Sequence, residues 1–191
     1  DKAISAFTDI HPDSLEVIIA DPLTSGEGQM VALALYGSQQ LLGVNQEAAL
    51  EFVSTWFSGS QNQPSTSHDA LEQFLAGMGD VLFHLEAANI QRVSNAHLRM
   101  IYPQSSIRTE PIAVTIPINM VPSQAALVES FHDFLWSQQA QSILTEHGVR
   151  SQLYARDPGD DQLAGSVVFT LDSLGNIHDL IRNIIDPLVS Q

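Results

Sequence analysis

The sequence predicts an α/β protein, on three observations. Residues 15–20 form a short β-rich apolar run, a turn of small residues follows, and residues 30–36 are nearly all apolar, as in a buried helix. Strand-like and helix-like segments then alternate along the rest of the chain, which is the pattern of α/β proteins. The 191 residues, 44% of them hydrophobic, can enclose one sizeable domain or two small lobes.

The first hundred residues are expected to hold three strands and three helices. Apolar spacing identifies the helices, and Ser67 or Asp69 caps the third, which ends at Gly77. The strands are expected at 15–20, 80–84 and 98–102, the helices at 28–42, 46–57 and 67–76, and a polar loop at 58–67.

The rest of the chain is expected to be mainly helical. Residues 103–109 are read as a polar connection, and 111–118 as an extended run with a proline at each side. Helices are expected at 122–136, at 140–147 before Gly148, and at 177–188, with a strand at 166–170 and an acidic turn at 157–161.

The turn at 21–29, Asp-Pro-Leu-Thr-Ser-Gly-Glu-Gly-Gln, is the strongest candidate for a ligand site. A strand, a small-residue turn and a helix start bring several free backbone N–H groups to one point, which suits an anion. Thr24 and Ser25 supply hydroxyls, and Gly26 lets a ligand approach the backbone. A plain helix cap is the alternative interpretation of the same residues.

The charge of the chain limits the partners that it can bind. Its 22 acidic and 7 basic residues give a net charge of −15, so nucleic acid is not an expected partner. No Lys or Arg lies between Lys2 and Arg92, so the 21–29 turn has no cationic neighbour in sequence. The chain has no cysteine, which excludes disulfides and is compatible with a periplasmic location.

No motif indicates catalysis, a metal site or a cofactor. The seven histidines lack the spacing of a zinc helix, and the acidic turn at 157–161 lacks the spaced ligands of a calcium loop. The chain has neither a G-x-S-x-G nucleophile elbow nor a P-loop lysine. We therefore expect no metal, no cofactor and no enzyme activity.

Five segments resemble, in order, those of the sulfate/thiosulfate-binding proteins of bacterial ABC importers, a family with the type 2 periplasmic binding protein fold. Residues 17–26 resemble the family's strand and Thr-Ser-Gly anion loop. Residues 77–82, Gly-Met-Gly-Asp-Val-Leu, are similar to its Gly-x-Gly-Asp-Val-Leu segment. The others are 102–114 (Tyr-Pro-Gln-Ser-Ser-Ile-Arg-Thr-Glu-Pro-Ile-Ala-Val), 134–141 (Phe-Leu-Trp-Ser-Gln-Gln-Ala-Gln) and 168–172 (Val-Phe-Thr-Leu-Asp).

The resemblance implies a periplasmic or extracytoplasmic protein that captures a small oxyanion between two hinged lobes and delivers it to an ABC transporter permease. Sulfate, thiosulfate, molybdate and phosphate are the candidate anions. It implies mostly the second lobe plus the C-terminal part of the first. Residues 1–14 would be a lead-in, 15–109 the second lobe, and 110–191 the hinge crossover and the C-terminal part of the first lobe.

The resemblance also implies the binding residues. Ser25 and Gly26 fall on ligand-contact positions, and the next residue offers its backbone N–H at the helix start. A further contact is implied near the start of the following helix. The candidate ligand-binding residues are Thr24, Ser25, Gly26, Glu27, Gly28, Ser67 and His68.

Two residues depart from the family pattern. The aromatic contact, a Trp in the family, falls on or next to Leu85, which removes an indole N–H donor. Glu27 adds a carboxylate to the anion loop. We expect Glu27 to point to solvent, where the helix dipole favours it. Pointed inward, it would repel a fully ionised anion, or it would accept a proton from an oxyanion such as hydrogen phosphate.

The front of the family's first lobe has no counterpart here, since the chain matches from just before the second lobe. An incomplete first lobe would leave sheet edges and apolar surface exposed to solvent. In that case we expect a homodimer or strand exchange to cover them. A sensor or protein-interaction module with a lost or repurposed pocket is the alternative function. An enzyme on the same scaffold is the third interpretation.

Overall fold

A computed structural model gives the structure of the chain. It describes residues 6–10, 14–60, 62–87, 98–116, 118, 120–151 and 166–189. The acidic turn expected at 157–161 lies outside the described residues.

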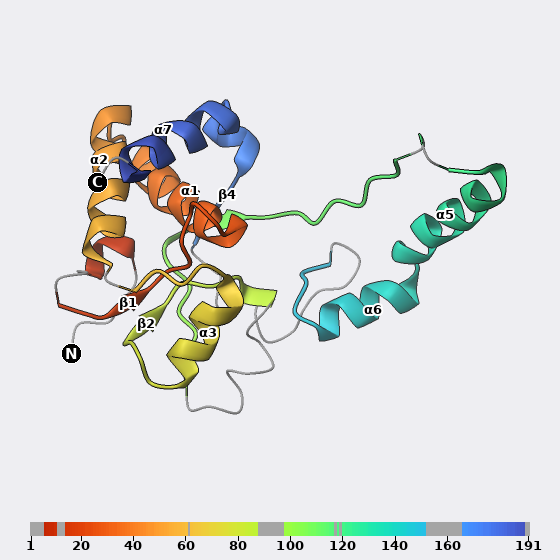
Figure 1. Cartoon of the computed structure of the whole chain (residues 1–191), viewed down its shortest axis with the longest axis horizontal. Helices are drawn as coiled ribbons and strands as arrows, with labels where there is room; N and C mark the ends of the chain where they lie inside the picture. Colours follow the sequence, from red (N-terminus) through yellow and green to blue (C-terminus); the bar gives the residue numbers. More distant parts are fainter. Residues whose placement is uncertain are drawn as a thin grey trace.

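The described residues form an α/β fold with short strands and longer helices (Figure 1). The helical segments agree closely with the sequence prediction, because caps and apolar spacing are local signals. The order is η1 (Phe7–Asp9), β1 (Val17–Ile18), α1 (Gly26–Leu41), α2 (Gln46–Gly59), α3 (Ser67–Leu75), β2 (Val81–Leu82), β3 (Ser105–Arg108), α5 (Pro122–Leu135), α6 (Gln138–Glu146), β4 (Val167–Thr170), η4 (Leu171–Leu174) and α7 (Ile177–Val189).

The first sheet pairs two strands that are far apart in the sequence. Strands β1 and β2 run parallel, with Val17 opposite Val81 and Ile18 opposite Leu82. Helices α1 to α3 form the crossover between them, as parallel strands require. The turn before α1 follows the carboxyl end of β1, and residues 83–85 follow the carboxyl end of β2. Because the two strands are parallel, both segments lie at the same edge of the sheet.

The second sheet corrects one prediction. Strands β3 and β4 pair in parallel over four residues, from Ser105–Val167 to Arg108–Thr170. The sequence predicts a strand at 98–102 and a polar connection at 103–109. In the structure 98–102 has no strand, so this prediction was wrong. Strand β3 forms because it pairs with β4 and packs on α1, which overrides the weak strand propensity of Ser-Ser-Ile-Arg.

Helix α1 is the centre of the core. It packs against α2, β3 and α7, and its residues from Val31 to Tyr36 are all buried, as their uniformly apolar sequence predicts. Phe7 and Ile10, from the expected lead-in, and Leu180 and Ile184, from α7, belong to the same cluster. The ends of the described chain thus pack together around α1. The assignment of residues to two lobes stays a prediction.

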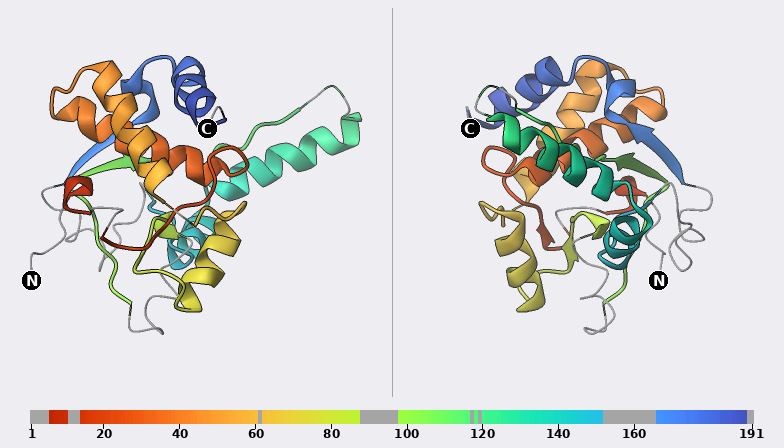
Figure 2. Two further views of the ribbon diagram at one scale, coloured as in Figure 1. Left: turned by 60° about the vertical axis from the view of Figure 1, so that its left-hand side comes forward. Right: turned by 90° about the vertical axis from the view of Figure 1, so that its right-hand side faces the viewer.

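Helices α5 and α6 form an arm that stands away from this core (Figures 1 and 2). An extended segment leads to the arm from β3, and its apolar side chains are exposed: 82% for Ile112 and 86% for Ile118. On α5 itself, Leu127 and Phe131 are also exposed. Among the described residues, Leu127 and Phe131 are therefore left largely uncovered.

None of the described helices combines the length and the apolar character that a bilayer crossing needs.

Candidate functional site

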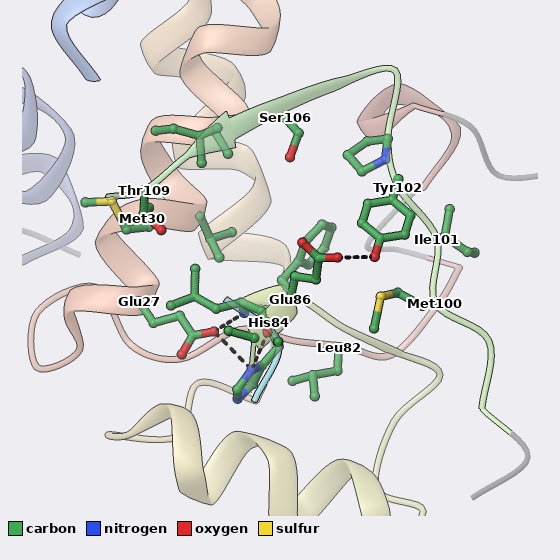
Figure 3. A pocket seen from close by; sticks show the side chains of 18 of the residues that line it. Glu27, Met30, Leu82, His84, Glu86, Met100, Ile101, Tyr102, Ser106 and Thr109 are labelled. Carbon is green, nitrogen blue, oxygen red and sulfur yellow. Dashed lines mark hydrogen bonds and ion pairs between the residues drawn. The ribbon is translucent and has the colours of Figure 1, made fainter. Parts of the chain in front are cut away.

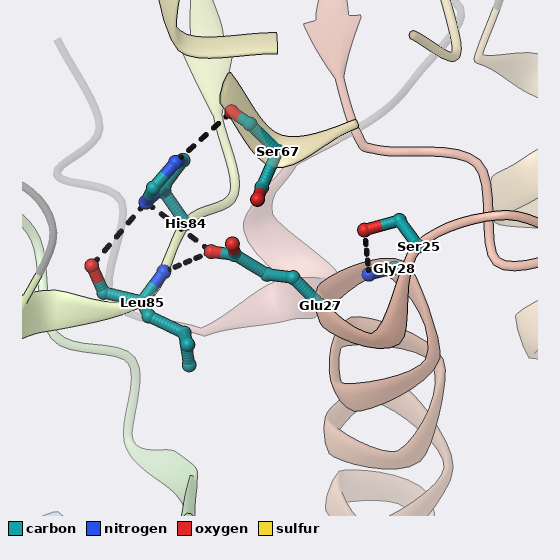
Figure 4. Close-up of polar contacts among 6 residues, drawn as sticks. All are labelled: Ser25, Glu27, Gly28, Ser67, His84 and Leu85. Carbon is teal, nitrogen blue, oxygen red and sulfur yellow. Dashed lines mark hydrogen bonds and ion pairs between the residues drawn. The ribbon is translucent and has the colours of Figure 1, made fainter. Parts of the chain in front are cut away.

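Three chain segments converge at the end of the first sheet: the start of α1, the start of α3, and the residues that follow β2 (Figure 4). Two helix starts and one strand end carry backbone N–H groups without partners in their own element. Such N–H groups, together with the positive ends of helix dipoles, bind anions.

Ser25 and Thr24 stabilise the turn before α1. Ser25 is the N-cap residue, is 7% exposed, and accepts the N–H of Gly28 on its Oγ at 3.3 Å. The Thr24 hydroxyl donates to the carbonyl oxygen of Ser65 at 2.8 Å, which ties this turn to the segment before α3. Both hydroxyls are thus used in the turn, as the helix-cap interpretation predicts.

The glycines of the turn have different surroundings. A Cβ on Gly28 would lie 2.2 Å from the carbonyl oxygen of Ala20, so only glycine fits between α1 and the end of β1. A Cβ on Gly26 would meet nothing within 4 Å. Within the described part of the chain, the N–H groups of Gly26 and Glu27 have no hydrogen-bond acceptor. At the start of α1, these two N–H groups are available to a ligand.

The carboxylate of Glu27 points into the site. It accepts the backbone N–H of Leu85 and lies 3.2 Å from Nδ1 of His84, with only 9% of its side chain exposed (Figure 4). The expectation that Glu27 points to solvent was therefore wrong. A buried carboxylate is favourable here because it gains the first-turn dipole of α1, a backbone donor and the His84 ring.

His84 connects the end of β2 to the start of α3. Its Nε2 lies 3.2 Å from the carbonyl oxygen of Ser67, and its Nδ1 lies 3.4 Å from that of Leu85. The side chain is 6% exposed. Ser67 thus takes part through its backbone, whereas the neighbouring His68 is exposed at the surface of α3.

A cavity of about 790 Å³ opens beside this cluster (Figure 3). Glu27, His84 and Leu85 line one part of it, and most of the remaining wall is apolar, from Met30 on α1 to Met100. Of the seven residues predicted to bind the ligand, only Glu27 lines this cavity.

A second polar group lies on the same cavity wall. Arg150 donates to both carboxylate oxygens of Glu86, at 2.7 and 2.9 Å, and the Tyr102 hydroxyl donates to Glu86 at 2.6 Å. Burial, followed by the hydrogen bond to Glu86, raises the pKa of Tyr102 to about 12. Hydrogen bonding to Glu86 also raises the pKa of Arg150. The guanidinium of Arg150 on this wall is therefore paired with a carboxylate of the protein.

Across the described ranges, no three His, Asp or Glu side chains come close enough together to hold a metal ion.

Two groups of this cluster are not among the residues predicted to bind the ligand: His84 and the backbone N–H of Leu85. His84 is the second residue after the Gly-Asp-Val-Leu segment, so its place near the strand end was visible in the sequence. Its contact with Glu27 was not, because that contact depends on the pairing of β1 with β2.

Two helix starts and a strand end that converge beside a cavity give this α/β fold the geometry that suits a small anion. The comparisons with known proteins give the family. Residues 1–150 match the family model described as bacterial extracellular solute-binding protein, and the chain belongs to this family.

The relatives agree with this assignment. The thiosulfate-binding protein of Pseudomonas aeruginosa is 29% identical over 154 residues, which are 78% of this chain and 46% of the relative. The sulfate-binding protein of Synechococcus elongatus is 27% identical over 157 residues, 80% of this chain and 44% of the relative. The chain thus spans about half the length of these relatives.

A solved structure supports the fold. The sulfate-binding protein SubI from Mycobacterium tuberculosis H37Rv superposes with a TM-score of 0.77 and 26% identity, over 97% of this chain and 63% of SubI. The predicted fold class, α/β and like a type 2 periplasmic binding protein, is confirmed, and so is the resemblance to the sulfate/thiosulfate-binding family.

Proposed function

We propose that the chain is an extracytoplasmic solute-binding protein for a small oxyanion, such as sulfate, thiosulfate, molybdate or phosphate, and delivers it to the permease of an ABC importer. The observation that carries the proposal is the convergence around Glu27. The Glu27 carboxylate at the start of α1 contacts Leu85 and His84 after β2, and Ser67 at the start of α3 contacts His84. The membership of the family and the names of the relatives support the same ligand class.

The proposed binding mechanism uses backbone dipoles more than charged side chains. The N–H groups of Gly26, Glu27 and Leu85 would donate to the oxyanion, and the His84 ring would add a side-chain donor. Ser25 would hold the helix start in place. The extended segment 111–118 would act as a hinge. The first lobe, whose C-terminal part lies within 110–191, would close on the ligand through this hinge.

Ligand-induced stabilisation tests the proposal. Unfolding would be followed by calorimetry with sodium sulfate, thiosulfate, molybdate and phosphate, each compared with sodium chloride at equal ionic strength. An anion at 100 times its Kd raises the free energy of unfolding by about 2.7 kcal/mol. If none of the four anions stabilises a folded sample, the oxyanion proposal is refuted.

A sensor or protein-interaction module is the second candidate function, and one observation favours it. The Glu27 carboxylate already takes two of the donors that a free anion would use, the Leu85 N–H and the His84 ring. Two like charges about 4 Å apart repel by about 4 kcal/mol at an effective dielectric constant of about 20. A site that keeps this carboxylate in place would bind no dianion, and the same calorimetry would then show no stabilisation.

A further inference from the structure

The Glu27 carboxylate lies where an oxyanion would have to bind in the candidate site. Glu27 lies in the first turn of α1, and its side chain extends away from the helix to reach Leu85 and His84 (Figure 4). The side chains of Glu27 and His84 are 9% and 6% exposed, so the contact is almost closed to solvent. A carboxylate held by a backbone N–H and a ring N–H occupies the donors that would hold a sulfate oxygen.

Both ring nitrogens of His84 face hydrogen-bond acceptors of the protein. Nε2 faces the carbonyl oxygen of Ser67, and Nδ1 faces the Glu27 carboxylate and the carbonyl oxygen of Leu85. Carbonyl and carboxylate oxygens accept hydrogen bonds, so a ring N–H of His84 on either side is directed at an oxygen of the protein. The Glu27 carboxylate occupies the Nδ1 side of the ring, which is the side that an external anion would need.

We propose that Glu27 is the specificity-determining residue of the anion site, where it acts as an internal competitor for external oxyanions. A free anion binds only in exchange for the Glu27 carboxylate, because both need the Leu85 N–H and the His84 ring. This inference rests on the proposed function, since it states what controls binding at that same site. It predicts that the unmodified chain binds sulfate weakly and that removal of the carboxylate strengthens binding.

The shape of the site supports exchange rather than simultaneous binding. Gly26 has open space around it, and the cavity begins beside Glu27, His84 and Leu85. A displaced Glu27 side chain therefore has room to turn away, while the backbone donors stay fixed by the caps and by β1–β2 pairing. The backbone site remains formed when the carboxylate leaves it.

The test is isothermal titration of sodium sulfate into the wild type and the Glu27→Gln and Glu27→Ala variants. Glu27→Gln keeps the size of the side chain, and Glu27→Ala empties the position. Glu47→Gln is the matched control, because Glu47 is an exposed glutamate in the first turn of α2. We expect both Glu27 variants to bind sulfate at least tenfold more tightly than the wild type, and the control to bind as the wild type does.

An NMR readout locates the effect. In Glu27→Gln, sulfate is expected to shift the backbone amide signal of Leu85 and the ring signals of His84, with smaller shifts in the wild type. If wild type and both Glu27 variants bind sulfate equally, the competitor role is overturned and the proposed function stands. If all folded variants fail to bind sulfate, thiosulfate, molybdate and phosphate, the proposed function fails, and the competitor role fails with it.

Discussion

A methyl group on Gly28 would lie 2.2 Å from the carbonyl oxygen of Ala20. This close approach brings the first turn of α1 directly onto the end of β1. It fixes the direction in which the helix start points, and with it the position of the Glu27 carboxylate one residue earlier. The third residue of the helix is therefore structural, whereas the first two offer their N–H groups to the site.

Gly28→Ala is expected to destabilise the protein strongly, by about 3 kcal/mol or more, because the new methyl group collides with rigid backbone. Gly26→Ala is the matched control, since a Cβ there meets nothing within 4 Å and alanine is a good helix former. Chemical denaturation followed by circular dichroism measures both. Equal stabilities for the two variants would show that α1 and β1 are not packed as closely as described.

Ser25→Ala is expected to cost about 1 kcal/mol of stability, because it removes the N-cap of α1. Ser137→Ala is a matched control: Ser137 caps α6 by accepting the N–H of Ala140 at 3.2 Å, far along the arm from the site. Both variants should lose similar stability in thermal unfolding. Only Ser25→Ala should also reduce the stabilisation by sulfate, and an equal sulfate response would remove Ser25 from the site.

The helices could be predicted from the sequence because their signals are local. Helix α2 begins at Gln46, as expected, and Asn45 caps it by accepting the N–H of Ala48. Gly77 and Gly148, the glycines expected to end two helices, both have positive φ angles, of 79° and 91°.

Strand β3 could not be predicted in the same way. Its sequence, Ser-Ser-Ile-Arg, has neither an apolar run nor a clear alternation, and it is stabilised by β4, which comes after α5 and α6. The orientation of Glu27 was missed for a related reason. The Glu27 carboxylate accepts the backbone N–H of Leu85, which lies 58 residues later in the chain. The pairing of β1 with β2 brings Leu85 close to Glu27.

The ionisation of Tyr102 should give stability a pH dependence at high pH. Its pKa in the folded chain is about 12, above the ordinary value of 10.0. A raised pKa stabilises the fold fully below pH 10, and the stabilisation is lost as pH rises through about 12. Tyr102→Phe should reduce the stability change between these values, as measured by urea denaturation at each pH. The hydroxyl that donates to Glu86 is absent from this variant, so an unchanged pH profile would contradict the described contact.

The exposed face of the arm leads to the last prediction, which is self-association. Residues 111–128 contain no charged side chain although the chain carries a net charge of −15, so two copies can meet there without repulsion. Ile112, Val114 and Phe131 are 82%, 76% and 57% exposed, and a second copy would cover this apolar surface. We expect light scattering to give a mass that rises above 20.8 kDa with concentration. Phe131→Asp should lower the association, whereas Leu42→Asp, at an exposed position on the C-cap of α1, should not. A mass of 20.8 kDa at every concentration would refute the expected homodimer.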